Sequence, residues 1–274
     1  WLGSCIRVVA YYTNFILISA FFGLGAGALL VRSRARLWRM IVPALFLAVL
    51  IGPLLGGIPH TNPSRHGEFV WIGTPLGLLP DWFGRVLLPY WLILLVVYLV
   101  NAGVFLMFGQ RLGYLFNQLA PLRAYAIEIT GSLFGIALFA LASFLGLSPP
   151  MWFLIGFALV IAILHTGRLA LGLSAVMAAL TVAITLPFST QFLWSRYYKI
   201  HVTPLTQIVD TQHGGVIEFN RPIGLSITVN NDYHQMILDL RQNPNPISHP
   251  FLESWRWTYD FPYRPDPAAP EATP

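Results

Sequence analysis

Glu128 is the acidic residue that lies well inside a long apolar run of this sequence, and Arg123 precedes it by just over one helical turn. A carboxylate inside a bilayer is costly unless it is paired, protonated or wetted, so Glu128 is a candidate for proton or ion handling. Because it lies near the end of its run, it could instead pair with Arg123 or with interfacial water. We favour this second role, at an interface or in helix packing.

Other residues with possible chemistry give weaker patterns. His60, His66 and Glu68 offer three possible metal ligands, but their spacing matches no common metal motif, and a solvated loop explains them better. The single cysteine, Cys5, excludes an intrachain disulfide and a cysteine-rich metal site. We therefore expect neither a metal nor a cofactor in this chain.

Glycines in the first apolar run could be mistaken for a nucleotide loop. The run Phe22-Gly23-Leu24-Gly25-Ala26-Gly27 lies inside apolar sequence, whereas a dinucleotide loop joins a strand to a helix in water. Gly23 and Gly27 are four residues apart and share a helix face, so we expect them to let a neighbouring helix approach closely.

These residues must be positioned by membrane-spanning helices. Apolar residues make up 56% of the chain and charged residues only 10%, a composition typical of lipid-embedded proteins. Runs of about 20 apolar residues predict helical spans, since spanning strands would alternate in runs of about ten. The six predicted spans are Val8 to Val31, Leu37 to Ile58, Val86 to Phe108, Ala124 to Leu147, the short Met151 to His165, and Leu169 to Pro187.

Arginines at the ends of the runs predict the orientation. Arg32, Arg34, Arg36 and Arg39 lie in the link between the first two runs, which the positive-inside rule assigns to the cytoplasm. Six crossings then place the segment after Pro187 on the outer face of a bacterial-type inner membrane. The arginines form no stripe that could follow a phosphate backbone, so nucleic acid is excluded as a partner.

The segment after the last run is polar and has a different organisation. Tyr197 to Pro204, Val216 to Phe219 and Leu225 to Val229 predict strands of a small antiparallel sheet, and Asp232 to Leu240 predicts a short helix capped by Asn231 or Asp232. The fold class is thus a mainly α, polytopic helical bundle followed by a small extramembrane β-rich segment. Its three domains are 1–187, the helical bundle; 188–241, the sheet with its helix; and 242–274, a proline-rich tail with aromatic residues.

Three stretches together carry a family resemblance. They are Tyr11 to Phe15 with Gly23 to Gly27; Pro121 to Tyr125 with Gly131 to Leu133; and Trp194 to Ile200 with Val229 to Gln235. In their order and spacing the chain resembles the membrane-bound spermidine synthase-like proteins, in which a multi-span region precedes a polyamine aminopropyltransferase-type module.

The resemblance implies roles for several residues. By this resemblance, Tyr198 stands where soluble aminopropyltransferases have the Tyr-Gln strand of their N-terminal sheet, and Tyr233 with His234 stands where they place a Tyr-His pair that lines the polyamine pocket. Gln235 replaces the glutamate that usually follows the pair. The family's glycine-rich, adenosyl-sulfonium-binding loop and its acidic catalytic residues are expected after Tyr259 to Tyr263, where this sequence does not continue into them, so we expect no catalytic residue in this chain.

Three functions remain open. We favour a catalytically incomplete spermidine synthase-like membrane protein that serves as an accessory or structural subunit of a larger membrane complex. Its partners would be membrane lipids and other membrane subunits, contacted through apolar helix faces and the aromatic tail from Phe251 to Tyr263, although that tail could equally pack on the chain's own sheet. The alternatives are a membrane-bound aminopropyltransferase whose catalytic domain lies outside this sequence, and a transporter, for which Asn101 and Glu128 are few polar groups but Pro53 and Gly56-Gly57 offer helix interruptions.

Overall fold

The structure is a computed structural model that describes residues 1–58, 88–164, 167–195, 198–210, 215–219, 221–239, 255 and 257–258. It forms two compact units. The first consists of residues 1–201 and 228–234, and the second of residues 202–227 and 235–274. His60, His66 and Glu68, for which we expect a solvated loop, lie outside the described residues, as does most of the aromatic tail.

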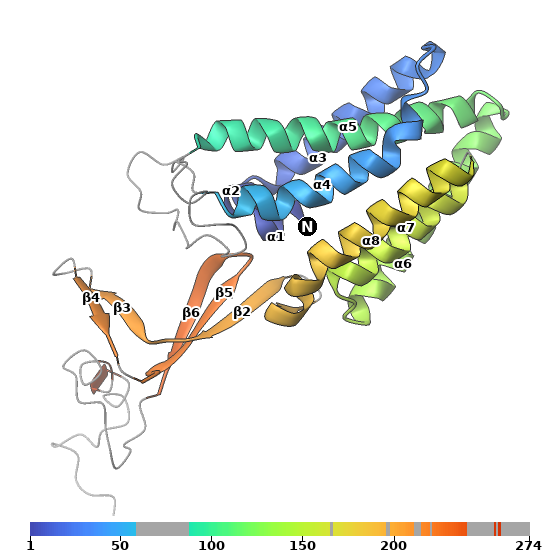
Figure 1. The fold of residues 1–274 in the computed structure, drawn as a ribbon. Coiled ribbons are helices and arrows are strands. Elements are labelled where there is room, and N and C mark those ends of the chain that lie inside the picture. The colour runs from blue at the N-terminus through green and yellow to red at the C-terminus, as the bar shows by residue number, and fades with distance from the viewer. Residues whose placement is uncertain are drawn as a thin grey trace, which may run out of the picture. The chain divides into compact units, whose positions relative to one another are not determined.

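The first unit is built from long apolar helices (Figure 1). In chain order its helices are α1 (Leu2–Cys5), α2 (Arg7–Tyr11), α3 (Thr13–Leu29), η1 (Leu30–Arg32), η2 (Leu37–Met40), α4 (Ile41–Gly56), α5 (Tyr90–Phe116), α6 (Pro121–Phe144), α7 (Pro149–Leu164) and α8 (Arg168–Gln191). Five segments of the described chain are long and apolar enough to cross a membrane: Thr13–Arg32, Leu37–Gly56, Tyr90–Phe116, Pro121–Phe144 and Arg168–Gln191. The 16-residue α7 is apolar but shorter, as the sequence predicted for this run.

The first predicted span begins too early. The helix breaks at Tyr12, whose φ of −111° and ψ of 45° lie outside the helical region, and α3 starts only at Thr13. The preceding apolar residues Ile6, Val8 and Val9 are at most 1% exposed and form the protein core together with Ile93 and Val97 of α5. Their apolarity therefore reflects burial in protein, which a hydropathy pattern does not distinguish from burial in lipid.

Helices α3 and α5 pack closely through glycine. A Cβ atom at Gly23 or Gly27 would lie less than 3.0 Å from the backbone of α5, and one at Gly109 of α5 would lie equally close to the backbone of Leu24. Within this contact, Asn101 Nδ2 donates hydrogen bonds to Ser19 Oγ at 2.6 Å and to the Ile16 carbonyl at 3.0 Å. Small residues thus bring the helices together, and the interhelical hydrogen bonds join them.

Six strands follow the helices. They are β1 (Leu193–Trp194), β2 (Lys199–Pro204), β3 (Gln207–Asp210), β4 (Gly215–Glu218), β5 (Gly224–Val229) and β6 (Asp232–Leu238). The four-stranded sheet has the order β1-β2-β5-β6, and β3 pairs with β4 in a separate antiparallel ladder with Gln207 opposite Glu218.

The short helix predicted over Asp232 to Leu240 is wrong, because Asp232–Leu238 form strand β6. Asn230 and Asn231 have φ values of 51° and 68°, the left-handed conformation that both central residues of a tight type I′ hairpin turn require. Asparagine adopts this conformation more readily than most residues, so the chain reverses here and β6 returns alongside β5. The same asparagines can cap a helix, which is why the local sequence was ambiguous.

We expect Gly27→Ala to lower the thermal unfolding midpoint of the detergent-solubilised chain, because its Cβ would overlap the α5 backbone at Leu106 and Gln110. Overpacking of this kind costs about 1–3 kcal/mol. The matched control is Gly25→Ala in the same helix, where no atom lies within 4 Å of an added Cβ. That substitution should leave the midpoint unchanged or raise it, since glycine in a helix interior costs about 0.5–1 kcal/mol relative to alanine. Equal effects of the two changes would contradict the close packing.

Candidate functional site

Lys199, the single lysine of the chain, is the most unusual charged residue of the first unit because it is only 1% exposed. It is the first residue of β2, and its Nζ donates a hydrogen bond to Asn231 Oδ1. Its backbone also joins the turn: Lys199 N–H donates to Asn230 Oδ1 at 3.1 Å, and Asn230 N–H donates to the Lys199 carbonyl at 2.9 Å. The lysine is therefore held by the β5–β6 turn at both its backbone and its side chain.

The same turn is bound to the N-terminal helix. Asn231 Nδ2 donates to the carbonyl oxygens of Ser4 at 3.1 Å and Cys5 at 2.9 Å. These carbonyls belong to the last turn of α1, where helical backbone acceptors have no partner within the helix. One asparagine side chain thus connects the buried lysine to α1, which is far from it in sequence.

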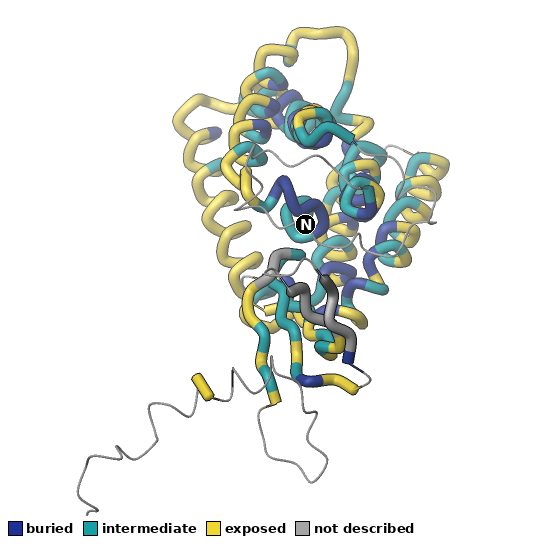
Figure 2. The backbone as a smooth tube through the Cα atoms, turned by 90° about the vertical axis from the view of Figure 1, so that its left-hand side faces the viewer, coloured by how far each residue is buried: buried dark blue, intermediate teal, exposed yellow. Residues whose placement is uncertain are grey.

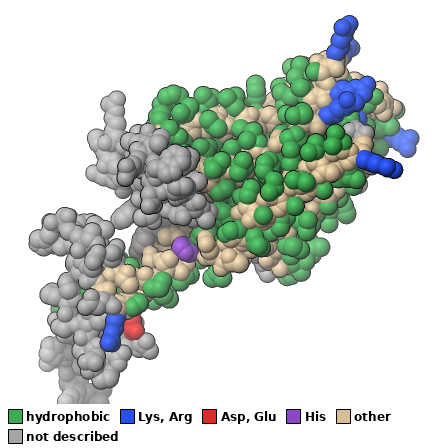
Figure 3. Space-filling model, viewed as in Figure 1, with side chains coloured by type: hydrophobic (Ala, Val, Ile, Leu, Met, Phe, Trp, Pro, Cys, Tyr) green, Lys and Arg blue, Asp and Glu red, His purple; other side chains and the backbone are tan. Residues whose placement is uncertain are grey.

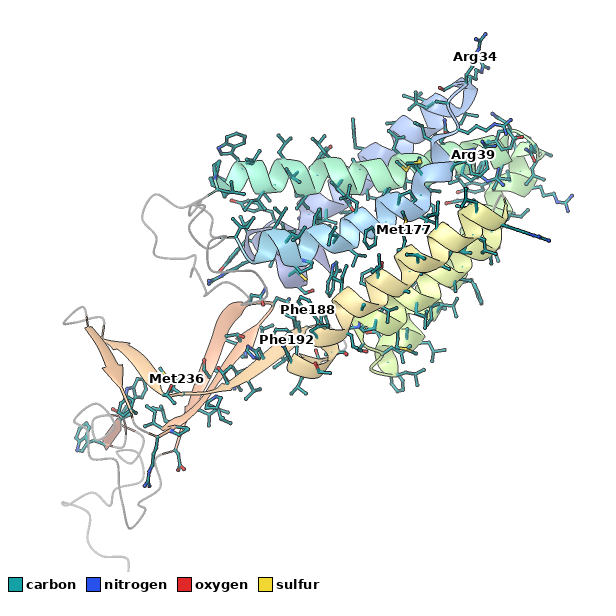
Figure 4. All side chains as sticks on the ribbon, in the orientation of Figure 1. Arg34, Arg39, Met177, Phe188, Phe192 and Met236 are labelled. Atoms are coloured by element: carbon teal, nitrogen blue, oxygen red, sulfur yellow. The ribbon has the colours of Figure 1, made fainter. Side chains whose placement is uncertain are left out.

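Aromatic rings enclose the ammonium group. Lys199 Nζ lies 4.5 Å from the ring centroid of Phe192 and 6.0 Å from that of Phe188, within the range of cation–π attraction. Figure 4 labels both phenylalanines, which lie at the end of α8 and just beyond it. The ring of His201 is 4.8 Å from that of Phe192, in an edge-on arrangement.

Burial controls the electrostatics of this site. It lowers the pKa of Lys199 to about 8, because the charged amine has lost its water, and it raises the pKa of Cys5 to about 11 for the corresponding reason. The pKa of His201 is lowered as well, first by burial and then by the neighbouring Lys199 charge. An amine of this pKa could exchange a proton near pH 8, but its 1% exposure closes it to a substrate. Lys199, Asn231 and the α1 carbonyls thus form a buried hydrogen-bonded cluster, which we call the lysine clamp.

Three of the four residues expected to line a polyamine pocket are exposed: Tyr198, His234 and Gln235. Tyr198, immediately before Lys199, is 52% exposed, and its backbone N–H and carbonyl both bond to Ser195. Tyr233, His234 and Gln235 lie in β6, and the side chains of the last two are exposed. Tyr198 directly precedes β2, and β5 lies between β2 and β6 in the sheet, so Tyr198 and the β6 residues do not come from neighbouring strands.

Helix α6 carries the other predicted polar pair. Arg123 is exposed, and Glu128 accepts a hydrogen bond from Ser132 Oγ at 3.4 Å; the described contacts of Glu128 do not include Arg123. None of the residues in the apolar window of α6 is buried. Figure 2 shows this helix as a long exposed tube on one side of the bundle. At Gly131 and Gly135 no atom lies within 4 Å of an added Cβ, in contrast to Gly23 and Gly27.

Sequence reasoning missed the lysine clamp. The lysine was visible as the only one in the chain, but its burial cannot be read from its neighbours in sequence, which mix aromatic, polar and aliphatic residues. Asn231 was recognised only as a turn or cap residue. Among the described residues, no group of three or more His, Cys, Asp or Glu side chains lies together as a metal site.

No protein-family model matches the chain, and comparisons with curated proteins and with solved structures also give no match. Function must therefore be argued from the residues and their geometry.

The pH dependence of stability tests the burial of Lys199. The folded lysine releases its proton near pH 8, whereas the unfolded lysine, with its ordinary pKa of 10.5, still binds one. Because the unfolded state then binds more protons than the folded state, the free energy of unfolding rises with pH above 8. We expect the thermal midpoint of the wild-type chain to rise between pH 8 and 9, and Lys199→Met to lack this rise.

Cys5 has the opposite effect at higher pH. Its folded pKa of about 11 exceeds the ordinary 9.0, so its contribution to stability is complete below pH 9 and declines above it. Cys5→Ser should therefore keep the rise and extend it toward pH 10. Identical pH profiles for the wild type and Lys199→Met would contradict the burial of the charge.

Proposed function

We propose that this chain is a multi-pass membrane protein of spermidine synthase-like ancestry that serves as an accessory or structural subunit of a larger membrane assembly. Helix α6 would bind the partner. The observation that carries this proposal is the polar and small-residue face of α6, on which Gly131, Ser132 and Gly135 are exposed and Glu128 is half-buried.

The face of α6 is defined by Glu128, Gly131, Ser132 and Gly135, which follow the i, i+3, i+4, i+7 spacing of one helix surface. A lipid-facing carboxylate is costly, and its bond from Ser132 is long at 3.4 Å. A partner helix could supply a donor to Glu128 and approach closely over the two glycines. The same small-residue chemistry brings α3 and α5 together within the chain.

The six-span topology is part of this proposal. Helix α7 is about 24 Å long at 1.5 Å per residue, less than the roughly 30 Å of hydrocarbon, so it would span with local thinning of the bilayer. Its packing beside α8 supports its inclusion in the bundle (Figure 1).

The arrangement of α4 supports the proposed sidedness. Helix α4 begins just after the arginine-rich link, and at its other end the carbonyl of Cys5 lies against Gly56. Because Cys5 also bonds to Asn231 and thereby to Lys199, the start of β2 lies at the end of α4 opposite the link. A cytoplasmic link therefore implies an outer location for Lys199, in a bacterial-type inner membrane.

Assembly through α6 can be tested with matched double substitutions. We expect Gly131→Leu with Gly135→Leu to release the chain from its native complex, because the leucines would hold a partner helix away. The control is Ala126→Leu with Ala137→Leu, on the opposite face of α6, which should leave the complex intact. Native gels and native mass spectrometry in mild detergent measure the mass of the complex. A wild-type mass that corresponds to this chain with bound lipid and no other protein would contradict the proposal.

Sidedness can be tested by single-cysteine labelling in a Cys5→Ser background. In intact spheroplasts, a membrane-impermeant maleimide should label Val202→Cys, since Val202 is exposed in β2, and should label Arg34→Cys only after lysis. The reverse pattern, or labelling of both in intact spheroplasts, would contradict the proposed topology.

A further inference from the structure

The link between α3 and α4 forms a cavity of about 530 Å³ with the end of α5. Its lining includes Arg32, Arg34, Arg36, Trp38, Gln110 and Arg111. Figure 3 shows Lys and Arg side chains gathered at this end of an otherwise hydrophobic helical body, and Figure 4 labels Arg34 and Arg39 there. A volume of this size falls within the range of about 300–1,000 Å³ typical of small-molecule sites.

Gln110 holds the link in shape. Its Nε2 donates to the carbonyl oxygens of Leu30 at 3.0 Å and Ala35 at 2.8 Å, and its Oε1 accepts from Trp38 N–H at 3.2 Å. The glutamine is only 3% exposed, so these bonds replace the ones that it would make with water. Both ends of the link are thereby attached to one side chain of α5, which makes the wall of the cavity a fixed structure.

The cavity is strongly cationic. Four arginines contribute to its lining, and none of the described residues that line it is acidic. The guanidinium of Arg111 lies 4.6 Å from the ring centroid of Trp38 and 5.6 Å from that of Tyr114, which orients it against two aromatic rings. Its Nε is buried and has no hydrogen-bond partner among the described residues. Clustered like charges and a buried donor without an acceptor both call for an anion.

Exposed apolar side chains lie close in sequence to the residues that line the cavity. Leu29, Met40 and Leu112 are 86%, 53% and 40% exposed, and each stands within two residues of a lining residue. In the membrane orientation proposed above, the link lies at the level of the cytoplasmic headgroups. A ligand that fits must therefore combine an anionic head with an apolar tail.

We propose that this cavity binds the phosphate headgroup of an anionic phospholipid, with the acyl chains lying along α3, α4 and α5. Guanidinium groups bind phosphate through paired, charge-assisted hydrogen bonds, and basic pockets between helices on the cytoplasmic side suit anionic headgroups. Free phosphate shares the headgroup chemistry but would leave the exposed leucines and methionine without a function. The inference depends on the proposed membrane insertion and is independent of partner binding at α6.

Thermal unfolding of the full chain in detergent tests the site, because a ligand that binds the folded state raises the midpoint. Phosphatidylglycerol should raise the midpoint by several degrees, and phosphatidylcholine should raise it by less than half as much. In Arg34→Gln with Arg36→Gln, the shift should fall by at least half. The control, Arg123→Gln with Arg168→Gln, removes two exposed arginines outside the cavity and should keep the full shift.

Further outcomes separate the lipid from other ligands and the site from the proposed function. Equal stabilisation by inorganic phosphate would assign the cavity to a free phosphate and overturn the lipid proposal. If both arginine double variants lost the same part of the phosphatidylglycerol shift, the shift would depend on net charge alone, and the lipid proposal would also be overturned. The α6 double-leucine variant should retain the phosphatidylglycerol shift, so failure of assembly and failure of lipid binding remain distinguishable. If an arginine variant does not fold, native mass spectrometry of the wild-type chain tests the proposal instead. Retained phosphatidylglycerol would support lipid binding, and its absence would contradict it.

Discussion

The close contact between α3 and α5 is the constraint on which the first unit depends. At Gly23 and Gly27 of α3, backbone atoms of α5 occupy the space that a side chain would need. At Gly109 of α5, the backbone of α3 does the same. This contact places Asn101 against Ser19 in the middle of the pair and Gln110 against the arginine link at its end. The polar groups inside the bundle and the cationic cavity at its end are therefore fixed by one helix pair.

The sequence predicts one side of this contact and not the other. Glycines four residues apart indicate a close-packing face, but they do not identify the helix that packs there. Gln110 was missed because it lies beyond Phe108, where the apolar pattern of the third run was expected to end. Helix α5 continues to Phe116, since the backbone partners of Gln110 in the link compensate for its polarity.

Two further segments show why local pattern is insufficient. Ile6, Val8 and Val9 look like the start of a span, yet they fill the core where α1 and α2 meet α5. Asn230 and Asn231 suit both a helix cap and a tight hairpin turn. The choice is made by partners distant in sequence, because Lys199 and the α1 carbonyls bond to the turn. Long-range hydrogen bonds of this kind leave no periodic signal in the sequence.

The distribution of polar groups distinguishes α6 from the rest of the bundle. Asn101 and Gln110 each have hydrogen-bond partners inside the chain, and Thr181 and Thr185 of α8 bond back to the preceding turn. Asn101 is thereby committed to packing, which removes one of the polar groups that a transporter would need at its midplane. The described hydrogen bond of Glu128 is a long one from its own helix; Glu128 is half-buried, and Gly131, Ser132 and Gly135 on the same face are exposed. Because lipid cannot satisfy a carboxylate, Glu128 leaves one unmet polar requirement on α6, which a donor on a partner helix could meet.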